Sequence, residues 1–304
     1  MDFDVIVDCG LMEFVSDETS LSCDKKHLVS IVNDYEDGSW RWDKFQNFIW
    51  DNIAETALSH QEREILSNQP RSLLIAAAKN LRLTDAETDI GRGSELAEII
   101  LYGILKYKYG ALPIVPKIFY KQNSQDNAKG ADSVHIVVEA NGDFSLWFGE
   151  AKFYNSIEDT RLGSIITSVK ASLDTEKLKK ENSIILNVSD IDHLDIPEET
   201  KNNIKGALAP KNSIDPIKSR IHVPILLLHE CAITASETKL SNEYLNKISR
   251  CHKNRAESYF TKQSAALSEI HNITEITFHL ILFPVPEKEP IVSQFVGDVK
   301  YHKG

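Results

Sequence analysis

The sequence predicts an α/β fold, a mixed sheet flanked by helices, on three observations. Apolar runs of strand length recur along the chain, and most are rich in Val, Ile and aromatic residues. Segments with apolar residues at helical spacing separate these runs, which is typical of α/β proteins. Two of the apolar runs flank Asn141-Gly142, the strongest short-range signal for a β-hairpin.

The first 90 residues are expected to form a largely helical segment, followed by a domain over residues 91–304. Residues 4–8 predict a short strand and residues 25–35 a helix, and apolar side chains in residues 42–53 share one helical face. Pro70 precedes a short apolar helix at residues 73–81. The aromatic residues of this segment could form a partner surface, although core packing is the commoner role for any one of them.

The second region alternates strands and helices. Ser94 is a good N-cap for a helix over residues 95–109, and its prolines make residues 113–120 an edge or irregular strand. After the hairpin, a helix and a strand predict a parallel crossover. The further elements expected are helices at residues 159–180, 197–208 and 237–271, and strands at residues 183–188, 220–229 and 273–283.

Composition excludes several classes of protein. The chain has 304 residues, enough for one or two domains, and no apolar run long enough to span a bilayer. Its N-terminus lacks the basic start of a signal peptide. The 4 cysteines are scattered without a Cys-x-x-Cys pair, so neither a zinc site nor a disulfide framework is indicated, and a reducing cytoplasm is expected.

The hairpin carries the chemistry. Asp132 opens its first strand, and Glu150 and Lys152 lie near the end of its second. Residues two apart on a strand point to the same side, so Glu150 and Lys152 share a face. The turn folds Asp132 back toward Glu150, and two converging carboxylates suit a hard cation such as Mg²⁺ or Mn²⁺.

Glu-x-Lys alone is a weak signal, because it recurs at residues 199–201 and 237–239. Only the copy at residues 150–152 ends an apolar run that pairs with an acid-bearing strand. The alternative is a hairpin with ordinary solvated charges at its ends. His229 and His279, which lie in buried strands, are expected to be hydrogen-bonded interior histidines.

Asp132 followed by Glu150-Ala151-Lys152 on paired strands resembles the core of the PD-(D/E)xK nuclease superfamily, with Glu95 matching the acid of the preceding helix. The superfamily proline is absent, since Ala131 precedes Asp132. The resemblance implies that Asp132, Glu150 and Glu95 bind Mg²⁺ or Mn²⁺, with the Ala151 carbonyl as a further ligand. It also implies that Lys152 orients the attacking water.

A closer resemblance rests on three segments: residues 92–96 with Glu98, Leu101 and Tyr102; residues 129–132; and residues 148–154. This pattern is similar to the HamA family, the nucleases of Hachiman anti-phage defence. The resemblance implies DNA cleavage by a nuclease that is held inactive by a helicase partner, HamB. A non-catalytic adaptor with the same fold and a sequence-specific restriction endonuclease remain open alternatives.

The net charge of −11 argues against a stand-alone nucleic-acid binder, because phosphate neutralisation normally supplies the affinity. A bound metal or a DNA-gripping partner would remove this objection. The best local basic patch predicted is Lys117, Lys121 and Lys129, just before Asp132, and Arg92 is a further candidate for a phosphate contact.

Overall fold

A seven-stranded sheet runs through the protein. The computed structural model describes residues 1–14, 25–83, 94–120, 131–139, 141–187 and 189–304. The strands of the sheet are β1 (Asp4–Gly10), β2 (Lys26–Val32), β5 (Leu112–Val115), β6 (Ser133–Val138), β7 (Phe144–Tyr154), β8 (Ile221–Glu230) and β9 (Thr277–Val285). Their spatial order is β1-β2-β9-β8-β7-β6-β5. Parallel pairing joins β2, β9, β8 and β7, whereas β1, β6 and β5 pair antiparallel, so the predicted mixed sheet is confirmed.

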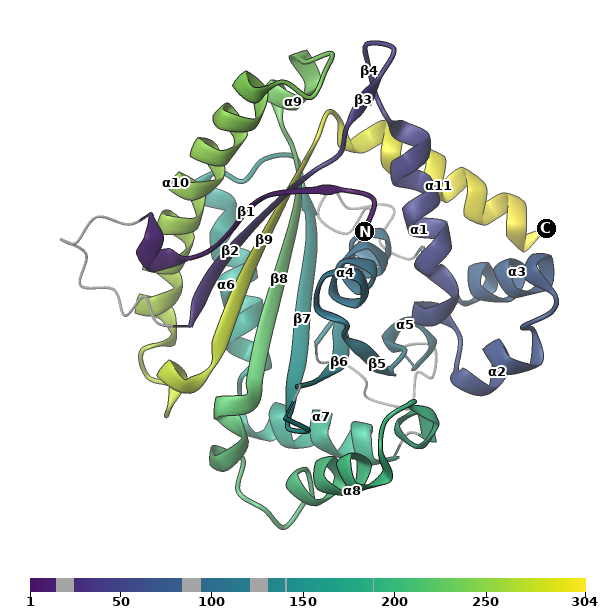
Figure 1. Cartoon of the computed structure of the whole chain (residues 1–304), viewed down its shortest axis with the longest axis vertical. Helices are drawn as coiled ribbons and strands as arrows, with labels where there is room; N and C mark the ends of the chain where they lie inside the picture. Colours follow the sequence, from purple (N-terminus) through teal and green to yellow (C-terminus); the bar gives the residue numbers. More distant parts are fainter. Residues whose placement is uncertain (15–24, 84–93, 121–130, 140, 188) are drawn as a thin grey trace.

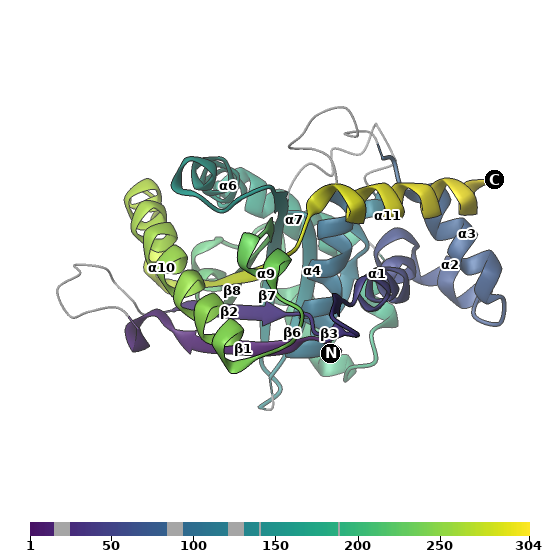
Figure 2. The same ribbon diagram turned by 90° about the horizontal axis from the view of Figure 1, so that it is seen from above.

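Helices cover both faces of this sheet (Figures 1 and 2). The helices are α1 (Trp42–Ala57), α2 (His60–Ile65), α3 (Pro70–Asn80), α4 (Ser94–Tyr109), α5 (Lys117–Tyr120), α6 (Asp159–Ser172), α7 (Thr175–Asn187), α8 (Glu198–Ala207), α9 (Ala232–Ser236), α10 (Asn242–Leu267) and α11 (Lys288–Lys303). One core cluster holds residues of α6, α7 and α10, and the other holds residues of α1, α3, α4 and α11. Within the described ranges, no helix combines the length and the apolar character needed to cross a bilayer.

The predicted hairpin is confirmed. Strands β6 and β7 pair antiparallel from Ser133 opposite Gly149 to Val138 opposite Phe144. In the turn, Gly142 has φ +82°, a conformation that favours glycine, and the Asn141 side chain accepts a hydrogen bond from the Asp143 N–H at 2.9 Å. Strand β7 is buried along almost its whole length because helices pack on both of its faces.

Two expected elements are wrong, and so is half of a third. Residues 25–35 do not form a helix, because β2 occupies Lys26–Val32 and pairs with β1 and β9. Residues 183–187 are not a strand but the end of α7, whose buried positions Leu178, Glu181, Asn182 and Ile185 have helical spacing. Consequently the parallel neighbour of β7 is β8 rather than residues 183–188. The second half of the expected strand at residues 113–120 is α5.

The first 90 residues share the central sheet. Strands β1 and β2 extend the sheet beyond β9, with Leu28 opposite Leu280, while α1 and α3 pack beside it. The expected division of the chain at residue 90 stays a prediction. One close approach fixes α4 against α1: a Cβ at Gly103 would lie 2.6 Å from the Phe48 ring, so only glycine fits there.

Candidate active site

Two carboxylates and one ammonium group meet beside the start of β6. Asp132 directly precedes β6, and its N–H donates to the Gly149 carbonyl at 2.8 Å. The Lys152 Nζ lies 3.4 Å from Asp132 Oδ2 and 3.8 Å from Glu150 Oε2. The structure therefore brings together three of the four predicted residues. Asp132, Glu150 and Lys152 are called the carboxylate–lysine cluster below.

Hydrogen bonds hold both carboxylates in place. The Ala151 N–H donates to Asp132 Oδ2 at 3.1 Å, so the backbone of β7 fixes this side chain. The Ser168 hydroxyl of α6 donates to Glu150 Oε2 at 2.8 Å. Glu150 is buried, and buried charges need such partners.

The electrostatics of the cluster favour a charged lysine. Burial alone would lower the pKa of Lys152, but the adjacent Asp132 and Glu150 carboxylates, with a smaller contribution from Glu98, raise it above its ordinary value. The amine therefore stays protonated at neutral pH. It can donate hydrogen bonds and stabilise negative charge, whereas it is unsuited to accept a proton as a general base.

A glycine allows β6, β7 and α4 to come together at this point. A Cβ added to Gly149 would lie 2.2 Å from the Ser133 Oγ and 2.7 Å from Leu101 Cδ2. Any side chain at this position would push apart the two strands that carry the cluster, or displace α4 from them. Close packing therefore explains why a glycine precedes Glu150, which the sequence motif alone does not explain.

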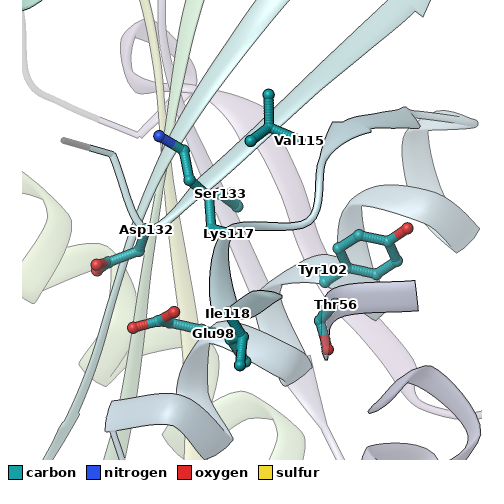
Figure 3. A pocket seen from close by; sticks show the side chains of 8 residues that line it. All are labelled: Thr56, Glu98, Tyr102, Val115, Lys117, Ile118, Asp132 and Ser133. Atoms are coloured by element: carbon teal, nitrogen blue, oxygen red, sulfur yellow. The ribbon is translucent and has the colours of Figure 1, made fainter. Parts of the chain in front are cut away.

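Glu98, rather than Glu95, is the acid of α4 that faces the cluster. Figure 3 shows the Glu98 carboxylate beside that of Asp132, and both residues line the same small cavity. Glu95 lies one turn earlier, and its two carboxylate oxygens accept hydrogen bonds from the backbone N–H groups of Arg82 and Leu83, each at 2.9 Å. The structure does not bring Glu95 to the other three predicted residues.

The helical spacing of α4 does not by itself single out Glu98, because every residue from Leu96 to Leu105 is buried. Three and four residues later come Leu101 and Tyr102, so Glu98 shares a face with two buried residues and is itself 6% exposed. The cavity that it lines has a volume of about 10 Å³, room for roughly one water molecule. Its lining residues are Thr56, Glu98, Tyr102, Val115, Lys117, Ile118, Asp132 and Ser133.

Lys117 does not contribute to a surface basic patch as expected. The Lys117 side chain is 1% exposed, and its Nζ lies 2.6 Å from Glu181 Oε2 of α7. It is therefore an interior charge and not a surface contact for phosphate. Lys121, Lys129 and Arg92 lie outside the described residues.

The donors near Lys152 suit a hard divalent cation in kind. Carboxylate oxygens are the ligands that Mg²⁺ prefers, and Asp132 and Glu150 converge on one positive charge. Within the part of the chain that the structure describes, no three His, Cys, Asp or Glu side chains are close enough together to hold a metal ion. Mg²⁺ is usually held by one or two carboxylates with water among its remaining ligands, so Asp132 and Glu150 are compatible with such an ion.

The two interior histidines behave as expected. His229 contacts the Glu230 carbonyl through Nδ1 at 3.0 Å and His252 through Nε2 at 3.1 Å. The Nε2 atom of His279 lies 2.9 Å from the Nδ1 atom of His222. Burial lowers the pKa of both His229 and His279, so both rings are neutral.

Comparison with known proteins gives one family. The family model described as HamA matches residues 11–297, which is nearly the whole chain. No curated protein matches the sequence. The matched range includes every residue of the carboxylate–lysine cluster, as well as Glu95 and Glu98.

Proposed function

The chain belongs to the HamA family of Hachiman defence-associated proteins, and from this premise we propose that it is a metal-dependent deoxyribonuclease. The observation that carries the proposal is the convergence of Asp132 and Glu150 on Lys152, with Glu98 facing Asp132. Phosphodiester hydrolysis builds negative charge on the phosphate. A protonated lysine beside the metal-binding carboxylates is suited to stabilise that charge.

Each residue has a distinct task in this proposal. Asp132 and Glu150 would hold Mg²⁺ or Mn²⁺, and Glu98 takes the place that the sequence pattern assigned to Glu95. The bound ion would polarise the phosphate and lower the pKa of its water. Lys152 donates hydrogen bonds to the attacking water or to a phosphate oxygen, and Ser168 keeps the Glu150 carboxylate turned toward the cluster.

The acidic character of the chain supports a partner in DNA binding. With a net charge of −11, the protein gains little from phosphate neutralisation on its own. A helicase partner would grip the DNA and deliver it to the nuclease. In the absence of that DNA, the helicase would keep the nuclease site inactive. This arrangement fits an effector of anti-phage defence, whose cleavage must be restrained in the uninfected cell.

A plasmid-degradation assay with Mg²⁺ tests the proposal on the purified chain, first alone and then with its helicase partner. Asp132→Ala and Lys152→Ala are expected to lose cleavage by ~10²–10³ or more, because each removes a charge that acts in the transition state. Lys170→Ala is the matched control, since this exposed lysine pairs with the exposed Glu269 and is not part of the carboxylate–lysine cluster. Wild-type cleavage that survives Lys152→Ala would contradict the assignment.

The rival proposal is a non-catalytic adaptor, because the same fold can serve without catalysis. An adaptor would show neither cleavage with the helicase nor a thermal shift that depends on Mg²⁺ or Mn²⁺. The nuclease should show both, and the shift should disappear in Asp132→Ala.

A further inference from the structure

A buried ion pair lies behind the candidate active site. Lys117 begins α5 and Glu181 lies within α7, and their side chains are 1% and 4% exposed with Nζ and Oε2 2.6 Å apart. Ion pairs this deeply buried contribute little net stability, because the loss of hydration offsets their attraction. Stability alone is therefore a weak reason for a lysine and a glutamate at these two positions.

The second oxygen of Glu181 points to another reason. Glu181 Oε1 accepts a hydrogen bond from the Ala131 N–H at 3.0 Å, and Ala131 directly precedes Asp132. The next N–H, that of Asp132 itself, donates to the Gly149 carbonyl at 2.8 Å. Two consecutive peptide groups before the Asp132 side chain are thus fixed, one by α7 and the other by β7.

The position of Lys117 excludes direct contact with a substrate. Its side chain is enclosed, and its ammonium group points away from the Glu98 and Asp132 carboxylates (Figure 3). Lys117 nevertheless lines the same cavity as Asp132, so the pair is adjacent to the site without facing its surface. Its contact with Glu181 gives it a route to Asp132 through the Ala131 backbone.

We propose that Glu181, held by Lys117, is a positioning residue that aims the Asp132 carboxylate at Ala151 and Lys152 through the Ala131 peptide. The proposal rests on the proposed function only in taking Asp132 as an active-site acid. The positioning itself can be measured without metal or DNA.

Two double variants of the full chain isolate the hydrogen bond to Ala131. Lys117→Met/Glu181→Gln and Lys117→Met/Glu181→Leu both remove the buried charges, but only glutamine keeps an oxygen that can accept from the Ala131 N–H. The readout is hydrogen exchange of the Ala151 amide, which donates to Asp132, in ¹⁵N-alanine-labelled protein. The buried Ala256 of α10 reports global opening in the same spectrum.

The expected result is exchange at Ala151 at least about tenfold faster in the leucine variant than in the glutamine variant, with Ala256 alike in both. Equal Ala151 rates in the two variants, or equal acceleration of Ala151 and Ala256, would overturn the proposal. If the leucine variant does not fold, Glu181→Asp replaces it, because aspartate keeps the charge and is one methylene too short to reach both partners. In Glu181→Asp, exchange that is faster than in the wild type at Ala151 but not at Ala256 supports the proposal. Exchange at Ala151 that equals the wild-type rate overturns it.

Loss of the nuclease hypothesis is distinguishable from loss of this one. Cleavage that is absent even in the wild type with its partner would remove the proposed function and leave the Ala151 comparison intact. When the wild type cleaves, the glutamine variant should cleave DNA faster than the leucine variant, the reverse of their order in Ala151 exchange.

Discussion

Two clusters of polar side chains lie against the same sheet and can be compared directly. One is the carboxylate–lysine cluster at β6 and β7, and the other is a histidine network formed by Ser30 of β2, His229 of β8 and His252 of α10. In the network, the Ser30 hydroxyl and His252 Nδ1 are 2.6 Å apart, and the two imidazoles are 3.1 Å apart. Burial lowers the pKa of His252 well below its usual value, whereas the carboxylates raise that of Lys152.

The difference teaches that burial alone does not identify a functional site. The histidine network excludes charge, and hydrogen bonds satisfy neutral rings that no substrate can reach. The carboxylate–lysine cluster keeps a protonated lysine beside two carboxyl groups, and the lysine side chain is still 23% exposed. A charged group with a perturbed pKa, specific charged partners and access to solvent is a candidate for function.

The largest expected effect concerns which acid of α4 belongs to the cluster. Glu98→Gln should lower DNA cleavage by ~10²–10³, because it removes a carboxylate facing Asp132 while keeping the side-chain volume. Glu95→Gln should leave cleavage near the wild-type rate, since Glu95 serves the backbone of Arg82 and Leu83. Rates measured on plasmid DNA decide between them, and a larger loss in Glu95→Gln would restore the assignment made from the sequence pattern.

The position of the helical acid shows where prediction from the sequence ends. The hairpin register is a local property of two strands and an Asn-Gly turn, so the meeting of Asp132 with Glu150 and Lys152 could be predicted. Which turn of α4 faces that hairpin depends on the rotation of the whole helix. Close packing at Gly103 against α1 and at Gly149 against Leu101 sets this rotation, and neither contact is local in sequence.

The same distinction between local and distant contacts applies to the secondary structure. Long amphipathic segments such as α1 and α10 could be predicted, because their apolar spacing extends over several turns. The apolar runs in β2 and in the last turns of α7 are short enough to fit either period. Their conformation depends on neighbours far away in the chain, since β2 is a strand because β1 and β9 pair with it on both sides.

The next largest expected effect is a pH dependence of the free energy of unfolding, which tests whether the histidine network is neutral in the folded protein. The pKa of His229 is lowered to about 4, so the unfolded chain takes up a proton below about pH 6.5 that the folded chain refuses. Stability contributed by this ring is complete above that pH and is lost as the pH falls toward 4. Urea unfolding of the wild type between pH 7 and pH 5 should show a decreasing free energy, by up to about 1.4 kcal/mol per pH unit for each such histidine.

His229→Gln provides the matched comparison, because the glutamine amide can still reach His252 but does not titrate. The slope of unfolding free energy against pH should become shallower by up to about 1.4 kcal/mol per pH unit in this variant. An unchanged slope would mean that His229 does not contribute to the pH dependence in this window.

The smallest expected effects come from removing one serine hydroxyl from each of the two regions. Ser168→Ala removes the hydrogen bond to Glu150 Oε2, and we expect cleavage to fall by about 10–100-fold, as is typical when a residue that orients a metal ligand is lost. Ser30→Ala removes the bond to His252 Nδ1 and leaves a buried ring nitrogen without its partner. It should cost about 1–3 kcal/mol of unfolding free energy and leave the specific cleavage rate of the folded protein unchanged.

Both serine variants are measured for cleavage rate and for urea unfolding, because the comparison depends on the two readouts moving independently. Ser168 is a residue of the half-exposed helix surface, so its replacement should change stability less than that of the fully buried Ser30. A Ser30→Ala protein that folds but cleaves slowly would show that the histidine network acts on the carboxylate–lysine cluster through β8, its neighbour in the sheet. Retention of wild-type cleavage in Ser168→Ala would mean that β7 alone orients Glu150.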